Sequence, residues 1–378
     1  MSFKPSHRLD GIEVSVIRKI NALAKPSTIN LGIGQLPYRA PEPLIQAGIR
    51  ALEQGTIQYT TNAGNAELRQ LIAKEHSNLC GWVKFPEDVI VTTGVEEALS
   101  IVFAAALNPG DEVLIPEIFF SVYETLSKFY GALPREYRLD KTFGLDLEDI
   151  ESKINPRTKL IIINSPANPT GKVLGNDQLS NLAEIIHSHQ DLYVVSDEVY
   201  SHLYFGEERP QSIARYSDKV IVTDGISKRA SATGLRIGWT IAPQEVTREL
   251  IKVHQYMVTC ASSISQAAAI PVLKGECSEH EEEYRKSLRE NRDLAIQLLS
   301  EIPGISIVPP EGAFYCFPNV SRFGGSMDVS MKVLDECDVL TIPGIAFGEK
   351  GEHHIRLSYA VDEASLYEGI RRIQETLK

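Results

Sequence analysis

The sequence predicts an α/β protein: a mostly parallel sheet of the seven-stranded type with helices on both faces, followed by a smaller α+β domain. Two features carry this prediction. From about residue 88, short continuously apolar runs alternate with amphipathic stretches, which is typical of parallel strands buried on both faces. Beyond Glu279 the pattern changes to a charged stretch and alternating runs. The runs that we expect to be strands of the large sheet are 89–92, 112–115, 160–163, 193–196, 220–223 and 237–242.

The stretches between these runs have the spacing of helices. In the clearest case, four apolar residues between Leu179 and Ile186 fall on one face. We expect helices at 97–107, 122–129 and 177–189.

The C-terminal part predicts a different architecture. A long charged helix at 279–301 leads into expected strands near 305–308 and 313–317. The stretch before Pro41 has few regular signals. We therefore expect an N-terminal arm that packs on the small domain or on a partner subunit, then a large and a small domain, at 1–40, 41–278 and 279–378 respectively.

Composition narrows the classes of function. At 378 residues the chain has room for about two domains. The formal charge of −12 disfavours a nucleic-acid partner, which usually needs a basic face. No run reaches the roughly 18 consecutive apolar residues that suggest a membrane span. Five cysteines without a CxxC pair predict neither a disulfide framework nor a metal site, and they fit a reducing cytoplasm.

Polar residues follow several expected strands at the point where each strand ends. They include Thr-Gly-Val-Glu at 93–96, the Asn-Pro-Thr-Gly motif that begins at Asn168, Asp197 with Tyr200, and Gly-Ile-Ser-Lys at 225–228. In a parallel sheet these carboxyl ends meet at one rim, where ligands bind. We therefore expect one site there.

The most specific stretch runs from Gly225 to Gly238. It contains Ser227 and Lys228, and Arg236 follows the lysine by eight residues. This spacing resembles the pyridoxal-phosphate attachment pattern of class I and II aminotransferases, which are fold-type I enzymes of the aspartate aminotransferase superfamily. The resemblance covers nearly the whole chain and implies that Lys228 holds the cofactor as a Schiff base, while Ser227 and Arg236 bind its phosphate.

The same resemblance assigns roles to other residues at the rim. Asp197 is similar to the aspartate that keeps the pyridine nitrogen protonated, so that the ring accepts electrons. Asn168 and Tyr200 resemble the pair that bonds the phenolate oxygen of the ring. Gly94, Val95 and Glu96 match the helix N-terminus that receives the phosphate, where free N–H groups favour an anion. Phe120 matches the aromatic ring over the cofactor.

Substrate positions also follow from the resemblance. Arg356 resembles the arginine that binds the substrate α-carboxylate, a bidentate task that suits guanidinium. Gly34 and Asn168 match residues that meet the substrate beside it. Tyr59 matches a tyrosine that reaches the phosphate in the neighbouring subunit, which implies a homodimer with shared active sites.

Three departures from the family pattern bear on specificity. The loop after Gly34 reads Gln-Leu-Pro-Tyr in place of the usual Glu-Pro-Asp-Phe. Gly225 stands where many relatives have a phosphate-binding serine. Glu96 stands where some aspartate-specific relatives have a lysine, and it would repel a second substrate carboxylate by roughly 1 kcal/mol or more. We therefore expect aspartate not to be the preferred donor, unless a cation from elsewhere replaces that lysine.

These observations predict a pyridoxal-phosphate-dependent aminotransferase that moves an amino group between an L-amino acid and a 2-oxo acid by a ping-pong mechanism. Other reactions of the same fold remain open, namely a β-lyase, an aminocyclopropane-type synthase or a racemase, because they would keep Lys228, Asp197 and Arg236. A more remote alternative is a non-catalytic regulator on the same fold.

Overall fold

The computed structural model describes residues 3–377. Its large sheet has seven strands in the order β2-β8-β7-β6-β5-β3-β4. All neighbours are parallel except β8, which is antiparallel to both β2 and β7. The predicted α/β class with a mostly parallel sheet is therefore confirmed. The strands are β2 (Val89–Thr92), β3 (Glu112–Pro116), β4 (Leu133–Tyr137), β5 (Thr158–Asn164), β6 (Tyr193–Asp197), β7 (Val220–Gly225) and β8 (Gly238–Ile241).

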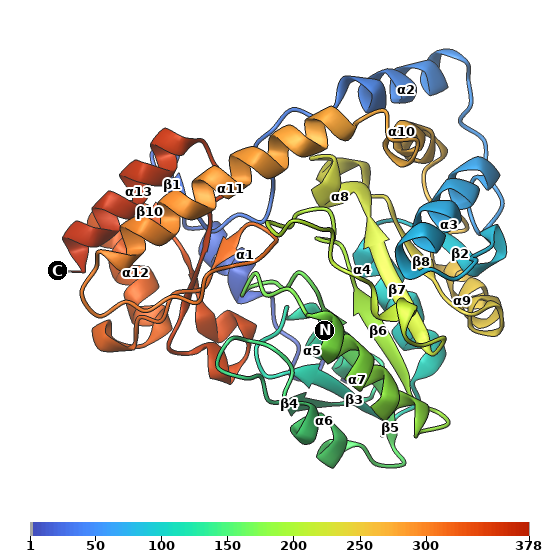
Figure 1. Ribbon diagram of the computed structural model, residues 1–378, viewed down its shortest axis with the longest axis horizontal. Coiled ribbons are helices and arrows are strands. Elements are labelled where there is room, and N and C mark those ends of the chain that lie inside the picture. The colour runs from blue at the N-terminus through green and yellow to red at the C-terminus, as the bar shows by residue number, and fades with distance from the viewer. Residues whose placement is uncertain (1–2, 378) are drawn as a thin grey trace.

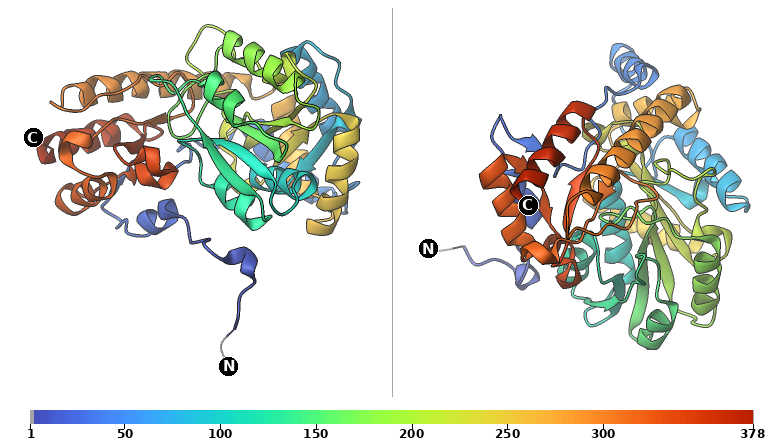
Figure 2. Two further views of the ribbon diagram at one scale, coloured as in Figure 1. Left: turned by 90° about the horizontal axis from the view of Figure 1, so that it is seen from below. Right: turned by 60° about the vertical axis from the view of Figure 1, so that its left-hand side comes forward.

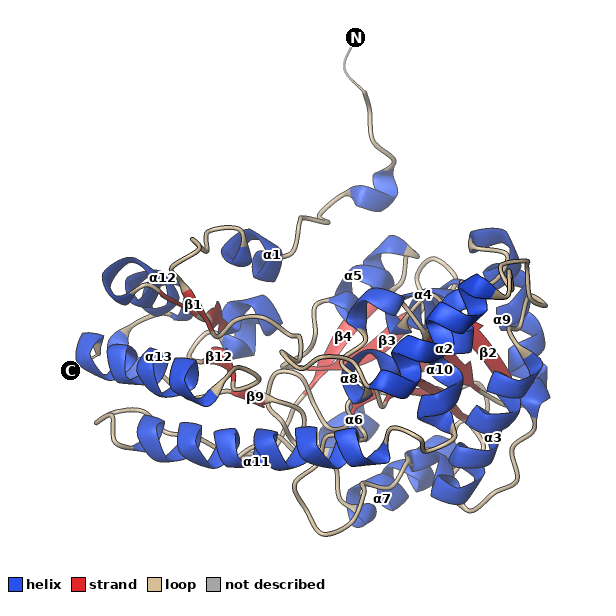
Figure 3. Ribbon diagram, turned by 90° about the horizontal axis from the view of Figure 1, so that it is seen from above, coloured by secondary structure: helices blue, strands red, loops and turns tan. Residues whose placement is uncertain are grey.

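Helices cover both faces of this sheet (Figures 1 and 3). Successive side chains of one strand point to opposite faces; in β5, for example, Ile161 joins one buried cluster and Ile162 joins another. The helices of this part of the chain, of which α2 packs on α10, are α2 (Glu42–Glu53), α3 (Ala66–Cys80), α4 (Val95–Ala106), α5 (Val122–Phe129), α6 (Leu147–Lys153), α7 (Asn176–His187), α8 (Ile226–Arg229), α9 (Gln244–Met257) and α10 (Ser263–Leu273).

The C-terminal elements pack around a second buried cluster, which also takes in Leu31 and Leu36 from the N-terminal stretch and residues 200–205. The strands β11, β12 and β9 form a small antiparallel sheet, and helix α11 runs from the large sheet toward α12 and α13 (Figure 1). The bounds are α11 (Ser278–Ser300), β9 (Tyr315–Cys316), α12 (Ser326–Cys337), β10 (Val339–Leu340), β11 (Ile342–Pro343), β12 (Ile355–Ser358) and α13 (Glu363–Thr376).

The stretch that begins at Phe3 and contains the short helix His7–Leu9 extends away from this body (Figure 2). Further along, α1 (Val16–Asn21) and β1 (Ile29–Asn30) pack on the C-terminal elements, because β1 pairs in parallel with β10. Within residues 3–377, no helix combines the length and the apolar character needed to cross a membrane.

One local expectation was wrong, and a second was confirmed only in part. The expected strand at 305–308 is only an isolated bridge between Ser306 and Asn319, because prolines at 303, 309 and 310 interrupt the pairing on both sides. The strand expected at 313–317 is limited to β9. In addition, β4 was not expected: it lies at the sheet edge, is largely exposed and contains Pro134, so it lacks the apolar pattern of the other strands.

Candidate active site

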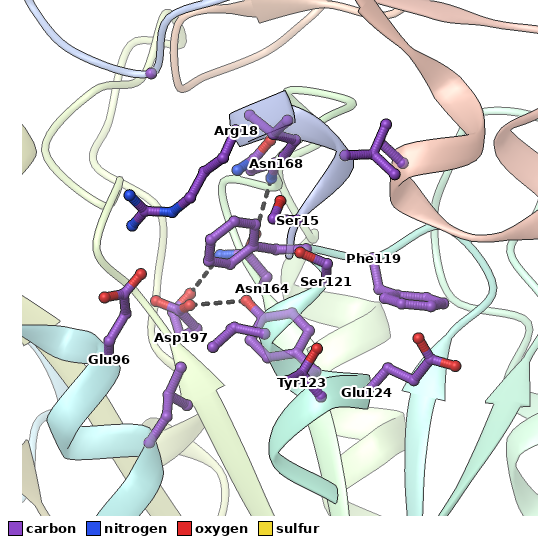
Figure 4. Close-up of a pocket in the computed structure, with 18 of the residues that line it drawn as sticks. Ser15, Arg18, Glu96, Phe119, Ser121, Tyr123, Glu124, Asn164, Asn168 and Asp197 are labelled. Atoms are coloured by element: carbon purple, nitrogen blue, oxygen red, sulfur yellow. Dashed lines mark hydrogen bonds between the residues drawn. The ribbon is translucent and has the colours of Figure 1, made fainter. Parts of the chain in front are cut away.

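A cavity of about 1030 Å³ opens between the carboxyl ends of the large sheet and the C-terminal elements. Figure 4 shows Asp197, Asn168 and Tyr123 converging on it from different elements. All of the predicted site residues line this cavity except Gly94 and Tyr59. The lining members are Gly34, Val95, Glu96, Phe120, Asn168, Asp197, Tyr200, Ser227, Lys228, Arg236 and Arg356.

Asp197 is the last residue of β6 and is buried at the floor of the cavity. Its Oδ2 accepts a hydrogen bond of 2.7 Å from the hydroxyl of Tyr123, and the backbone N–H of Val199 donates to Oδ1 at 3.3 Å. Burial raises the pKa of Asp197 to about 6, although the bond from Tyr123 opposes that rise. A buried carboxylate with this pKa favours a positively charged partner.

The turn between β2 and α4 forms the end of the site that we expect to bind phosphate. Gly94 has φ 85°, a conformation that favours glycine, and a Cβ there would lie 2.6 Å from Nη2 of Arg236. The N–H groups of the first turn of α4 therefore stand beside a guanidinium without a side chain between them. Glu96 in the same turn is more than half exposed and lies 3.8 Å from Nη2 of Arg236.

The structure gives a physical reason for Gly225, one of the departures from the family pattern. A Cβ at this position would lie 2.7 Å from the carbonyl oxygen of Ile237 and 2.9 Å from Cα of Gly238. Strands β7 and β8 approach too closely here for a serine. Ser227, two residues later, is buried and lines the cavity, so its hydroxyl is available to this end of the site.

Lys228 reaches the cavity from α8, and its Nζ donates to the carbonyl oxygen of Gly34 at 2.6 Å. Burial, followed by the charges of Arg356 and Arg236, lowers the pKa of Lys228 to about 8. A substantial fraction of this amine is therefore neutral near physiological pH, as nucleophilic attack on an aldehyde requires.

Arg356 lies on β12 and is 2% exposed. Its Nη1 donates to Oδ1 of Asn168 at 2.9 Å and its Nη2 donates to the carbonyl oxygen of Gly32 at 2.7 Å. The guanidinium lies between the rings of Tyr315 and Phe347, at 4.3 and 4.9 Å from their centroids. Its Nε is buried and has no hydrogen-bond partner within the described residues. Among the described residues, its hydrogen bonds go to neutral oxygens, so no carboxylate there neutralises its charge.

Two predicted residues take other positions in the single chain. Tyr59 is 84% exposed and lies outside the cavity. Gly94 packs against Arg236 rather than lining the cavity wall. Phe120 does line it, in an edge contact with Tyr123 at 6.2 Å.

Three residues stand out among the lining residues that sequence reasoning did not assign to the site. Tyr123 bonds Asp197, the hydroxyl of Tyr315 lies 3.1 Å from that of Tyr200, and Arg18 extends over the cavity from α1 (Figure 4). The spacing of Tyr123 after Phe120 was a usable signal. Tyr315 and Arg18 come from segments without a motif.

These residues fit pyridoxal phosphate. The open turn at Gly94 with Arg236 suits a phosphate, buried Asp197 suits a protonated pyridine nitrogen, and Lys228 brings an amine of lowered pKa to the same cavity. The unpartnered Nε of Arg356 marks a separate place for an anion.

Comparison with known proteins agrees with this geometry. Residues 26–373 match the family of class I and II aminotransferases. The chain belongs to this family. It is similar to an aspartate aminotransferase of Pyrococcus horikoshii, with 34% identity over 97% of this chain and 95% of that protein. It is also similar to aromatic-amino-acid aminotransferase 2 of Thermococcus litoralis, with 33% identity over 99% and 98% of the two chains.

A solved structure extends the similarity of this aminotransferase to three dimensions. The aspartate aminotransferase of Thermus thermophilus with maleate has a TM-score of 0.95 and 32% identity, and each chain is covered completely. The protein is thus a transaminase of the pyridoxal-phosphate-dependent class I and II family, as the sequence predicted.

Proposed function

We propose that Lys228 carries pyridoxal phosphate covalently, and that the enzyme moves an amino group between an L-amino acid and a 2-oxo acid by a ping-pong mechanism. The observation that carries the proposal is the convergence of Lys228, Asp197 and Arg356 on one cavity. When bound, the cofactor supplies an electron sink for the bonds of the substrate α-carbon.

Lys228 is the group that moves protons. An amine with a pKa of about 8 is close to the working pH of most enzymes, so it accepts and returns a proton with little cost. Its present contact with the carbonyl oxygen of Gly34 also holds the amine next to the loop that faces substrate.

Asp197 holds a proton at the ring nitrogen, and Tyr123 orients the carboxylate through the bond to Oδ2. A full positive charge beside Asp197 would oppose the effect of burial on its pKa. Asn168 and Tyr200 lie on the neighbouring wall of the cavity, where they suit the phenolate oxygen.

Arg356 binds the substrate α-carboxylate. Its two hydrogen bonds go to neutral oxygens, those of Asn168 and Gly32. The substrate carboxylate would therefore pair with a buried guanidinium whose charge is not yet neutralised. The backbone of Gly34 stands at the same end, since a Cβ there would lie 2.6 Å from the hydroxyl of Tyr315.

A homodimer with shared sites completes the proposal. Tyr59 belongs to an exposed apolar surface with Ile57, Tyr256 and Met257. The two segments adjoin, because Nδ2 of Asn62 donates to the carbonyl oxygen of Thr259 at 2.8 Å. Such patches favour coverage by a partner subunit, and coverage by a second copy would bring Tyr59 to the partner's phosphate.

We further propose that residues 1–40 act as an arm, 41–278 as the cofactor-binding domain and 279–378 as the small domain. The separate buried cores of the large sheet and of the C-terminal elements support this division. A cytoplasmic location is supported by the five free cysteines.

Borohydride reduction of the holoenzyme followed by peptide mapping tests the attachment site. We expect the pyridoxyl group on Lys228, and a label on another lysine would contradict the assignment. Turnover with a panel of amino acids and 2-oxo acids tests the reaction. Release of ammonia or loss of chirality without amino transfer would instead favour a lyase or a racemase.

A further inference from the structure

Arg18 is a cation of the cavity without a charge partner. It lies in α1 and lines the cavity, and Figure 4 shows its guanidinium extending over the side that holds Asp197 and Glu96. Within residues 3–377, its side chain has no hydrogen bond or ion pair. Its neighbour Lys19 differs, because Nζ of Lys19 lies 2.7 Å from Oε2 of Glu13 and Lys19 does not line the cavity.

The other cations that line the cavity have partners or proposed roles. Lys128 is 2.6 Å from Oε1 of Glu124. Arg236 lies beside Glu96 and the phosphate end, Arg356 is the proposed site of the α-carboxylate, and Lys228 carries the cofactor. One positive charge at the mouth of the site is therefore left for a ligand.

Arg18 and Arg356 are carried by one packed unit. Ile20 of α1 is buried in a cluster with Ile342 and Phe347, and the guanidinium of Arg356 lies against the ring of Phe347. Strand β12, which contains Arg356, pairs with β11, which contains Ile342. The backbone segments that carry Arg18 and Arg356 thus belong to one packed unit, and both side chains line the same cavity, with Arg356 buried and Arg18 exposed.

We propose that Arg18 binds the side-chain carboxylate of a dicarboxylic amino acid or 2-oxo acid. The inference rests on the proposed function, since it takes Arg356 as the site of the α-carboxylate. Guanidinium suits this task because its planar fork matches a carboxylate. Glu96 stands where some aspartate-specific relatives have a lysine, and that replacement disfavoured acidic substrates. In this structure Glu96 lies near Arg236, and Arg18 supplies a positive charge at the same side of the cavity.

The test compares Arg18→Met with Lys19→Met, a matched loss of one cation from the same helix. Succinate and butyrate, which have equal chain lengths and differ by one carboxylate, are titrated into the holoenzyme by calorimetry. We expect wild type and Lys19→Met to prefer succinate by about tenfold, and Arg18→Met to lose that preference while its butyrate affinity stays within about twofold.

Steady-state kinetics provide the second readout. In Arg18→Met, kcat/KM for glutamate and aspartate should fall by about tenfold, while kcat/KM for alanine and phenylalanine should stay nearly constant. A dicarboxylate preference that survives in Arg18→Met, or is absent from wild type, overturns the proposal. Because the calorimetry needs no turnover, a protein that binds succinate through Arg18 without transferring amino groups would contradict the proposed function alone.

Discussion

Arg229, the residue after Lys228, anchors the cofactor lysine to two distant helices, and its removal should destabilise the protein strongly. Arg229 is 8% exposed; its Nη1 lies 2.8 Å from Oε2 of Glu75 in α3, and its Nε lies 2.7 Å from Oε1 of Glu281 in α11. Burial alone would lower the pKa of Arg229, but these two carboxylates outweigh burial and raise it.

The substitution Arg229→Met leaves both carboxylates in place. Glu75 keeps Nη1 of Arg209 at 2.9 Å, whereas Glu281 keeps only Nδ1 of His202 at 3.6 Å. Breaking a buried ion pair by removing one partner costs about 3–5 kcal/mol. Because Glu75 retains a charged partner, we expect a loss of about 3 kcal/mol in the free energy of unfolding.

Urea unfolding of the apoprotein at pH 7.5 measures this loss, with Arg248→Met as the control. Arg248 is exposed and its Nη2 bonds only Gln244, so its removal should cost under about 0.5 kcal/mol. The double variant Arg229→Met/Glu281→Gln should recover part of the stability, since it no longer buries an unpaired charge.

The difference in the free energy of unfolding between wild type and Arg229→Met should also depend on pH. Burial would raise the pKa of Glu75, but the contact with His202 and the charge of Arg229 hold it well below its ordinary value of 4.5. A carboxyl with a lowered pKa contributes stability that is present above pH 4.5 and is lost as the pH falls through the folded-state pKa. The gap between wild type and Arg229→Met should therefore narrow below pH 4.5. If Arg229→Met lowers the free energy of unfolding by less than about 1 kcal/mol at pH 7.5, the buried ion pairs do not stabilise the protein as argued.

Three further predictions concern the active site. Asp197→Asn should retain cofactor but lose at least about a hundredfold in kcat, because one positioned charge in a dry site is worth about 3 kcal/mol; near wild-type turnover would contradict this role. Mixed dimers of Lys228→Ala and an inactive Tyr59 variant should regain about a quarter of wild-type activity, from one intact site in half of the dimers, and an active monomer in gel filtration with activity detection would exclude the shared site. The rate at which apoprotein incorporates pyridoxal phosphate should rise with pH around a midpoint near 8, which is the pKa of Lys228; a midpoint near 10 would show that the amine is not desolvated.

The sequence was informative where one physical constraint dominated. Continuous apolar runs such as β5 had to be strands buried on both faces, and the spacing from Lys228 to Arg236 matched the pattern of the family to which the chain belongs. Strand β4 was not predictable, because an edge strand needs little apolar surface. Arg18 and Tyr315 reach the cavity from opposite ends of the chain, and only tertiary packing brings such residues together.

The pairing of β1 with β10 has a consequence for biogenesis. Thr28 and Asp338, which hydrogen-bond beside these strands, are 310 residues apart in the chain. At about 5–20 residues per second, a ribosome needs roughly 15–60 s to synthesise that interval. During this time the apolar side chains of Leu31 and Leu36, which are buried in the finished protein, lack their C-terminal partners. The arm therefore reaches its final packing, and the cavity gains Arg356, only after translation is nearly complete.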